Sequence, residues 1–313
     1  MDRLLTHPPR SDLTSGFLYA LAAYGLWGLF PLYFSLFDSV SPFEVVAYRI
    51  IWSLAFCVLL LAVTRSFGSV RDVVRTPRRL GLLTGAAVAI TINWTTYVYS
   101  VSTDQVVEAA LGYFINPLVT VALGVVVLRE RLRAWQWIAI AIATVGVVII
   151  GIGEAAAPWL GLVLAFSFGA YGLLKKVARV DAIPSLTIET AVLVPFAFVV
   201  LVVIEAAGSA AIASQGWGMG ALLALLGPVT AVPLLAYAAA ANRLPLSVLG
   251  ILQYSTPTVI FILGITVFGD TVNTLEWIGF GFIWFALAVF STDTVRRSRQ
   301  ANRADALEVA EQA

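Results

Sequence analysis

The sequence predicts an all-α integral membrane protein with ten transmembrane helices, arranged as two inverted repeats of five helices each. Three observations lead to this fold class. The 313 residues are 60% hydrophobic and only 12% charged, with a mean hydropathy of +0.93. The apolar runs are about 20 residues long, enough to cross a bilayer core as helices. One run also recurs later in the chain at a fixed offset. A soluble protein of this size is excluded, because too little polar surface would remain to face water.

The apolar runs favour helices because they are uninterrupted, whereas strands of a membrane barrel alternate in polarity over about 10 residues. We predict spans at 16–37, 43–64, 80–101, 105–128, 134–152, 158–176, 184–205, 218–240, 246–268 and 274–292. Residues 1–15 and 293–313 are expected to be polar cytoplasmic tails. The first repeat covers 16–152 and the second covers 158–292.

The basic residues predict the orientation of the spans. Except for Arg49, all of the 19 Lys and Arg residues fall in the two tails, in alternate loops or at the span ends beside those loops, which share one side of the membrane. Lys and Arg concentrate in short cytoplasmic loops. The pattern therefore predicts a multi-pass protein with both termini in the cytoplasm. The opposite loops carry the acids Asp38, Asp104, Glu154, Glu205 and Asp270.

The internal repeat is clearest in the fourth and ninth spans. The segment EAALGYFINPLVTVALG (108–124) matches VLGILQYSTPTVIFILG (248–264) at a constant offset, which places Pro117 on Pro257. Such a match indicates an internal repeat. Because each half has five spans, the halves enter the membrane from opposite sides. Inverted repeats with interrupted helices at matching places are typical of secondary transporters.

The two matched prolines lie near the middle of their spans and are expected to line the substrate pathway. A proline removes a backbone donor and clashes with the carbonyl four residues back, which frees the carbonyls of Tyr113 and Gln253. A free carbonyl in lipid needs a partner, and lining a cavity is one solution. An ordinary kink, satisfied by neighbouring helices, is the alternative for Pro117 and Pro257.

Arg49 is the exception to the charge pattern, because it lies inside the second predicted span. An arginine deep in the bilayer costs at least about 2.5 kcal/mol, so we expect a functional role unless the side chain reaches the outer headgroups. Glu108 enters the fourth span from the same side and is the expected partner. Glu44, nearer the interface, is the alternative, and an acidic group of the substrate is a third.

Polar and aromatic side chains at similar depth complete the predicted pathway. The amides either bind substrate or hydrogen-bond between helices, and the aromatic residues either form a wall for an amphipathic ligand or belong to the interfacial belt. Lys175 and Lys176 are interpreted as cytoplasmic anchors, and Glu189 as an interfacial charge. The amide candidates are Asn93, Asn116 and Gln253, and the aromatic candidates are Trp27, Trp94, Tyr97, Tyr113, Tyr254 and Tyr237, the repeat mate of Tyr97.

Several kinds of chemistry are not expected. The single Cys57 excludes an internal disulfide, and the single His7 argues against a histidine metal site. The sequence contains no GxxxxGK[ST] stretch for ATP. We expect no cofactor, no enzymatic activity and no nucleic-acid partner. The expected partners are the lipid bilayer and a small molecule, anionic or zwitterionic; coupling to protons or another ion and simple exchange both stay open.

Five segments together carry a resemblance to a known family: LGYFINPLV (111–119), AAYGLWG (22–28), YRIIWS (48–53), TAVPLL (230–235) and QYSTPT (253–258). They resemble the RarD branch of the EamA group, within the drug/metabolite transporter superfamily. The resemblance covers residues 15–293 and implies a ten-helix inverted-repeat permease of the bacterial inner (plasma) membrane. Members of this branch often carry a chloramphenicol-sensitivity or resistance label.

The function expected from these features is secondary transport of a small organic metabolite or drug by alternating access. The alternative is an integral-membrane protein that is not a transporter, such as a lipid-modifying enzyme or a scramblase. A lipid-modifying enzyme would need acidic residues clustered at one membrane face, and here they are scattered. A channel would need a continuous polar stripe along a span, and no span carries one. Saturable flux with counterflow would distinguish a carrier from a channel.

Overall fold

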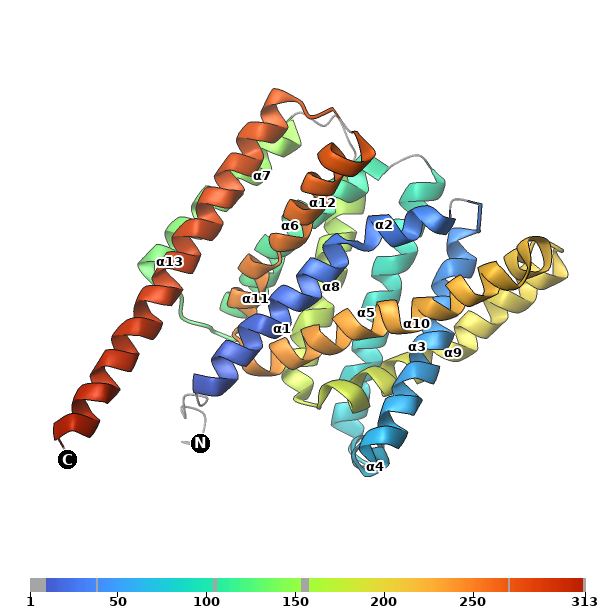
Figure 1. Cartoon of the computed structure of the whole chain (residues 1–313), viewed down its shortest axis with the longest axis horizontal. Helices are drawn as coiled ribbons and strands as arrows, with labels where there is room; N and C mark the ends of the chain where they lie inside the picture. Colours follow the sequence, from blue (N-terminus) through green and yellow to red (C-terminus); the bar gives the residue numbers. More distant parts are fainter. Residues whose placement is uncertain (1–9, 38, 104–105, 153–157, 270, 312–313) are drawn as a thin grey trace.

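A computed structural model of the protein describes residues 10–37, 39–103, 106–152, 158–269 and 271–311. Within these ranges every regular element is helical (Figure 1). The elements are α1 (Arg10–Gly28), α2 (Phe30–Phe34), η1 (Ser35–Phe37), α3 (Pro42–Thr64), α4 (Phe67–Val74), α5 (Pro77–Ser102), α6 (Val106–Val126), α7 (Ala134–Ile152), α8 (Pro158–Ala178), α9 (Ala182–Ala206), α10 (Ala211–Arg243), α11 (Leu246–Leu252), α12 (Ser255–Leu263), the π-helical turn η2 (Gly264–Phe268) and α13 (Thr274–Glu311).

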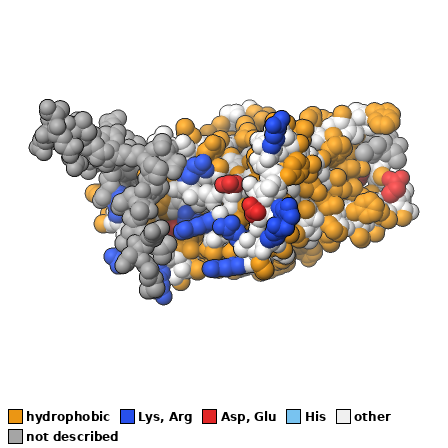
Figure 2. Space-filling view, turned by 90° about the horizontal axis from the view of Figure 1, so that it is seen from below, with side chains coloured by type: hydrophobic (Ala, Val, Ile, Leu, Met, Phe, Trp, Pro, Cys, Tyr) orange, Lys and Arg blue, Asp and Glu red, His pale blue; other side chains and the backbone are white. Residues whose placement is uncertain are grey.

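The helices confirm an all-helical integral membrane protein. Over the described part of the chain, eight helices are long and apolar enough to cross a membrane, and Gly112–Val126 within α6 is a shorter apolar helix. Helices occupy each of the ten predicted ranges. Many large apolar side chains face outward, and they form broad surfaces in the space-filling view (Figure 2). Lipid rather than water suits such a surface.

One face of the molecule gathers the basic side chains. Both ends of the described chain and the short helix α4 lie toward the lower edge of Figure 1. Seen from that side, Lys and Arg side chains cluster on the surface (Figure 2). This arrangement agrees with the alternation of basic loops in the sequence.

The two terminal segments differ from the expected tails. α1 begins at Arg10, and α13 continues well beyond the predicted span to Glu311. The extension of α13 has a simple cause. Residues 293–311 are rich in Ala and Arg and also contain Glu. These are strong helix formers, so the helix propagates past the apolar stretch.

Only one of the two matched prolines interrupts its helix, contrary to the expectation of two broken helices. α6 runs through Pro117 as a single helix. The ninth predicted span instead divides into α11, a turn at Gln253 and Tyr254, α12 and the π-helical turn. Pro257 lies in the first turn of α12, where its missing N–H has no intrahelical role. The carbonyl of Gln253 accepts a hydrogen bond from the Thr256 N–H at 3.0 Å, so it does not stay free.

The two halves of the chain pack against each other along most of their length. α3 lies along α9, α6 along α11, and α7 along α13, while α5 packs on α8 and α1 on α10. Each of these contacts joins a helix of the first half to one of the second. The principal core between them is built from small and aromatic side chains, including Ala86, Ala240, Tyr24 and Tyr237.

Two crossings between the halves depend on glycine. A Cβ atom at Gly250 in α11 would lie 2.8 Å from the Pro117 carbonyl oxygen and 2.7 Å from a Val121 methyl group of α6. Where α7 meets α13, a Cβ atom at Gly146 would lie 2.8 Å from the Gly279 carbonyl oxygen. Small residues let helices approach this closely in membranes. These positions therefore set the distance between the halves.

Candidate substrate-binding site

Arg49 lies in an aromatic enclosure. Its Nε donates a hydrogen bond to the Thr230 hydroxyl of α10 at 3.0 Å. Its guanidinium carbon lies 4.5 Å from the ring centroid of Trp94, 5.2 Å from that of Phe34 and 5.8 Å from that of Phe30. Aromatic faces attract a cation at these distances, more strongly where water is excluded. Four helices, α2, α3, α5 and α10, thus hold the guanidinium inside the protein.

Two tyrosines extend this site toward α6. The rings of Tyr97 and Tyr113 are 6.2 Å apart at 68°, an edge-to-face contact, and both side chains lie close enough to Arg49 to interact with its charge. The structure thus brings together Arg49, Trp94, Tyr97 and Tyr113 of the predicted pathway. Phe30, Phe34 and Thr230 were not predicted; Phe30 and Phe34 share one face of the short helix α2, an i, i+4 spacing that could have indicated them.

No carboxylate among the described side chains forms an ion pair with Arg49. Glu44, the alternative partner, instead accepts a hydrogen bond from the Ala211 N–H at the start of α10, at 3.0 Å. The side chain of Glu108, the expected partner, lies outside the described residues. A pairing of Arg49 with Glu108 therefore stays a prediction.

The other predicted amides make protein contacts. Asn93 donates from Nδ2 to the Leu164 carbonyl at 2.9 Å and to the Ser167 hydroxyl at 3.1 Å, which joins α5 to α8. Asn93 therefore hydrogen-bonds between helices, which was the alternative to substrate binding. The Thr120 hydroxyl lies between the side-chain oxygens of Asn116, at 3.4 Å, and Gln253, at 3.5 Å. This buried polar cluster connects α6 to the break between α11 and α12.

Trp27 and Tyr237 belong to a separate aromatic cluster in the principal core. Trp27 lies 5.6 Å from both Phe168 and Tyr237, measured between ring centroids. Tyr237 stacks on Tyr171 at 5.8 Å and 18°. The Tyr237 hydroxyl is buried and has no hydrogen-bond partner among the described residues. A side chain at Gly172 would collide with that hydroxyl, so α8 and α10 meet here through glycine.

Tyr254, Pro117 and Pro257 lie outside both the group around Arg49 and the cluster of Trp27 and Tyr237. The Tyr254 hydroxyl donates to the Phe114 carbonyl at 3.3 Å, and its ring packs in a second apolar cluster with Phe280 and Ile283 of α13. Pro117 and Pro257 are both buried, and the Pro117 carbonyl faces Gly250. The predicted aromatic wall is therefore divided into three groups, and only one of them surrounds Arg49.

A buried ion pair was missed by the sequence analysis. Lys175 of α8 and Glu189 of α9 are 4% and 2% exposed, and their Nζ and Oε1 atoms are 2.6 Å apart. Ser185 bonds to both, at 2.7 Å from Lys175 and 2.8 Å from Glu189. Lys175 is thus not a surface anchor, and Glu189 is not an interfacial charge. Opposite charges placed on either side of the short α8–α9 connection were the available signal.

Glu130, in the connection after α6, holds the first turn of α11. Its carboxylate accepts from the N–H groups of Leu246, at 2.7 Å, and Ser247, at 2.9 Å, and from the Ser247 hydroxyl at 2.6 Å. A carboxylate at a helix N-terminus satisfies unpaired donors and complements the helix dipole. Lys176 donates to the Ala241 and Leu244 carbonyls at the end of α10. Glu130 therefore ties the first half to the second, whereas Lys176 joins α8 to the end of α10 within the second half.

Known proteins resemble this chain over most of its length. The profile of the EamA-like transporter family matches residues 14–152. Protein RarD of Streptomyces exfoliatus is 45% identical, over 93% of this chain and 92% of that protein. A protein of Pseudomonas aeruginosa named as an uncharacterized transporter is 40% identical, over 93% and 97%. A crystal structure aligns with a TM-score of 0.70 at 18% identity, over 91% of this chain and 98% of that one, which shows a common fold. The chain therefore belongs to the EamA-like transporter family, in its RarD branch.

Proposed function

We propose that this membrane transporter carries a small organic anion or zwitterion by alternating access, with Arg49 as the principal substrate-binding residue. The observation that carries the proposal is the aromatic enclosure of Arg49, in which no described carboxylate neutralises the guanidinium. A charge inside the membrane is costly, and such residues usually mark a substrate or ion pathway.

The chemistry of the guanidinium favours a carboxylate or phosphate as its ligand. Arginine offers five N–H donors in a rigid fork, and Nε uses one of them on Thr230. The fork matches a carboxylate or phosphate in a two-point contact, which is stronger and more directional than a contact with a point charge. Trp94, Tyr97 and Tyr113 would contact the apolar or aromatic body of the same ligand.

The proposed mechanism uses two inverted halves, residues 16–152 and 158–292, each with five membrane spans and with both tails in the cytoplasm. Its support is the pairing of helices across the halves: α3 with α9, α6 with α11 and α7 with α13 each join matching members of the two repeats. A site between inverted halves can open to either side in turn. Residues 1–15 and 293–313 stay outside this unit.

The break at Gln253 and Tyr254 is the proposed moving joint. It lies beside Thr120 and Pro117 of α6, in the polar cluster between the halves. Irregular backbone inside a membrane protein is tolerated where protein or a cavity satisfies it. Gln253 and Asn116 would exchange their hydrogen bonds with Thr120 as the joint moves. No enzymatic step is part of this proposal, and the coupling of transport to protons, to another ion or to exchange stays open.

The test begins with a thermal-shift screen of purified protein against carboxylates, phosphates, amino acids and neutral drugs, including chloramphenicol. Hits are then measured by counterflow in liposomes. Arg49→Gln should reduce counterflow at least tenfold, because a charged hydrogen bond contributes about 1.5–3 kcal/mol. Arg49→Lys should reduce it less, since it keeps the charge but not the fork.

The matched control is Arg71→Gln, which removes the same charge from the exposed helix α4. It should leave counterflow unchanged. Wild-type counterflow in Arg49→Gln, at normal protein yield, would contradict the assignment of Arg49. Hits confined to cations would contradict the proposed substrate class.

A further inference from the structure

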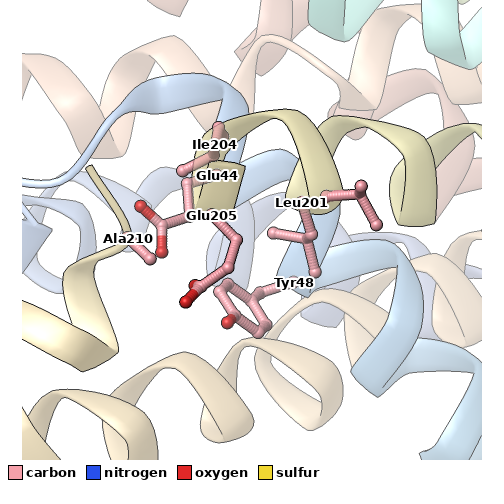
Figure 3. Close-up of a pocket in the computed structure, with 7 residues that line it drawn as sticks. Glu44, Tyr48, Leu201, Ile204, Glu205 and Ala210 are labelled. Atoms are coloured by element: carbon pink, nitrogen blue, oxygen red, sulfur yellow. The ribbon is translucent and has the colours of Figure 1, made fainter. Parts of the chain in front are cut away.

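A pocket of about 230 Å³ opens where three helix ends meet, and it is separate from the enclosure of Arg49. Its walls come from the start of α3, the end of α9 and the start of α10. Figure 3 shows the carboxylates of Glu44 and Glu205 extending into the same space, with the Tyr48 ring at its edge. Leu201 and Ile204 form an apolar wall beside them. The pocket is thus acidic on one side and apolar on the other.

Glu44 leaves one oxygen unsatisfied in this pocket. The residue is only 1% exposed. Its Oε1 accepts from the Ala211 N–H at 3.0 Å, whereas its Oε2 is buried and has no hydrogen-bond partner among the described residues. A buried polar atom of a charged group without a partner costs more free energy than a neutral one. The unsatisfied oxygen therefore points to a ligand that donates a hydrogen bond.

The neighbouring groups define the charge of that ligand. Glu205 lies close enough to Glu44 for their negative charges to repel each other. The Tyr48 side chain lies within electrostatic range of both carboxylates. The described residues that line the pocket include no Lys or Arg. Two carboxylates without a counter-charge favour a cation in the space between them.

We propose that this pocket binds a primary ammonium group attached to an apolar or amphipathic body. A primary ammonium has three N–H donors, which match the three acceptors Glu44 Oε2, the Glu205 carboxylate and the Tyr48 hydroxyl. The carbon chain of the ligand would lie against Leu201 and Ile204. This inference depends on the pocket alone and not on transport or on Arg49.

Other cations fit the pocket less well. Hard metal ions such as Ca²⁺ and Mg²⁺ take six or more oxygen ligands at short distances, and the described walls are apolar apart from the three side chains. A quaternary ammonium has no N–H donor and would leave Glu44 Oε2 unsatisfied. The position of the pocket at helix ends, near one face of the molecule (Figure 1), gives two sources of a primary amine: the headgroup of a lipid and a soluble amine.

The test uses the full-length protein in nanodiscs of phosphatidylcholine at pH 7, with thermal unfolding followed by tryptophan fluorescence. Ethanolamine should raise the unfolding midpoint by about 2 °C at ten times its half-saturating concentration. Choline at equal ionic strength should not. A second set of nanodiscs contains phosphatidylethanolamine. A rise there without soluble amine identifies the lipid as the source, whereas a rise with ethanolamine alone identifies a soluble ligand.

Variants locate the effect. Glu44→Gln keeps an oxygen for the Ala211 N–H and should weaken the response to ethanolamine about tenfold. Glu205→Gln tests the same pocket at an exposed position, where folding is not at risk, and should weaken it similarly. Asp72→Asn, the same charge change on the exposed helix α4, should leave the response intact. An equal response to choline would overturn the proposal. So would a response to ethanolamine that survives both Glu variants. Stabilisation by lower pH, with no effect of either amine, would overturn it as well.

Discussion

Lys175 and Glu189 show how a pair of charges can be held inside a membrane-spanning bundle. Ser185 bonds to both of them, and the Lys175 ammonium lies 5.6 Å from the ring centroid of Tyr171. The Tyr171 hydroxyl is buried near Glu189. Cys57 of α3 is close enough to interact with both charges. Each charge therefore depends on the other for compensation.

Breaking this pair should cost more than removing it. Lys175→Met leaves Glu189 buried without compensation and should destabilise the protein by about 3–5 kcal/mol. Lys175→Met combined with Glu189→Gln removes both charges and should recover most of that loss. Unfolding midpoints of the wild type, both single variants and the double variant, in one detergent, measure the coupling. Additive losses in the double variant would show that the pair contributes nothing through its charges.

The charged residues also show which buried charges can be predicted from the sequence and which cannot. Arg49 was selected as a candidate because it departs from the charge pattern, which the sequence alone displays; its role stays a prediction. Lys175 and Glu189 conform to that pattern, since both lie near the expected cytoplasmic ends of their spans. Their burial depends on the packing of α5 and α10 against α8 and of α3, α5 and α10 against α9, which involves residues far apart in the chain. A pattern of residues close together in the sequence does not reveal such contacts.

At the scale of elements, Gly250 controls how closely α11 approaches α6. Gly250→Ala should destabilise the protein by about 1–3 kcal/mol, because the added methyl group would overlap the Pro117 carbonyl and a Val121 methyl group. Gly281→Ala is the matched control in α13: nothing lies within 4 Å of its added Cβ atom, and alanine favours a helix by about 0.5–1 kcal/mol. Thermal unfolding compares the two. Equal effects would mean that the α6–α11 distance is not set by Gly250.

The helix ranges were predictable, whereas the form of the ninth span was not. Apolar runs of about 20 residues reflect the thickness of the bilayer, so the positions of the helices could be predicted. Eight of the described helices are long and apolar enough to cross a membrane, and the count of ten spans stays a prediction. Pro117 and Pro257 occupy matching positions, yet only the second interrupts its helix. Thr256 and Thr258 flank Pro257, and the Thr258 hydroxyl bonds to the Tyr254 carbonyl at 2.8 Å. Such side chains satisfy the backbone where the helix stops, and their effect depends on the neighbouring helices.

For the whole molecule, the clustering of basic side chains on one face leads to a test of orientation. Reporter fusions after Asp104, Glu154 and Asp270 should behave as external. Fusions after Arg75, Arg131 and the C-terminus should behave as cytoplasmic, because Lys and Arg remain on the inner side. Alkaline phosphatase and green fluorescent protein, fused at the same sites, give opposite readouts and control for expression. A reversed pair of neighbouring loops would show that the span count is wrong.

The two pieces of the interrupted helix share one neighbour and differ in another. The Tyr24 hydroxyl of α1 donates to the Leu249 carbonyl of α11 at 3.0 Å. α11 is held by Glu130 and lies against α6 at Gly250. α12 is held by the Thr256 hydroxyl, which donates to the Tyr24 carbonyl of α1 at 3.0 Å, and by the contact of Val259 with Gly28. Because Tyr24 of α1 bonds to both pieces, a displacement of α12 relative to α6 must either break the bond from Tyr24 to Leu249 or be absorbed by the two residues between the pieces. Gln253 and Tyr254 join the two pieces, so under the proposed alternating-access mechanism their amide protons should exchange with solvent in step with the motion of the joint.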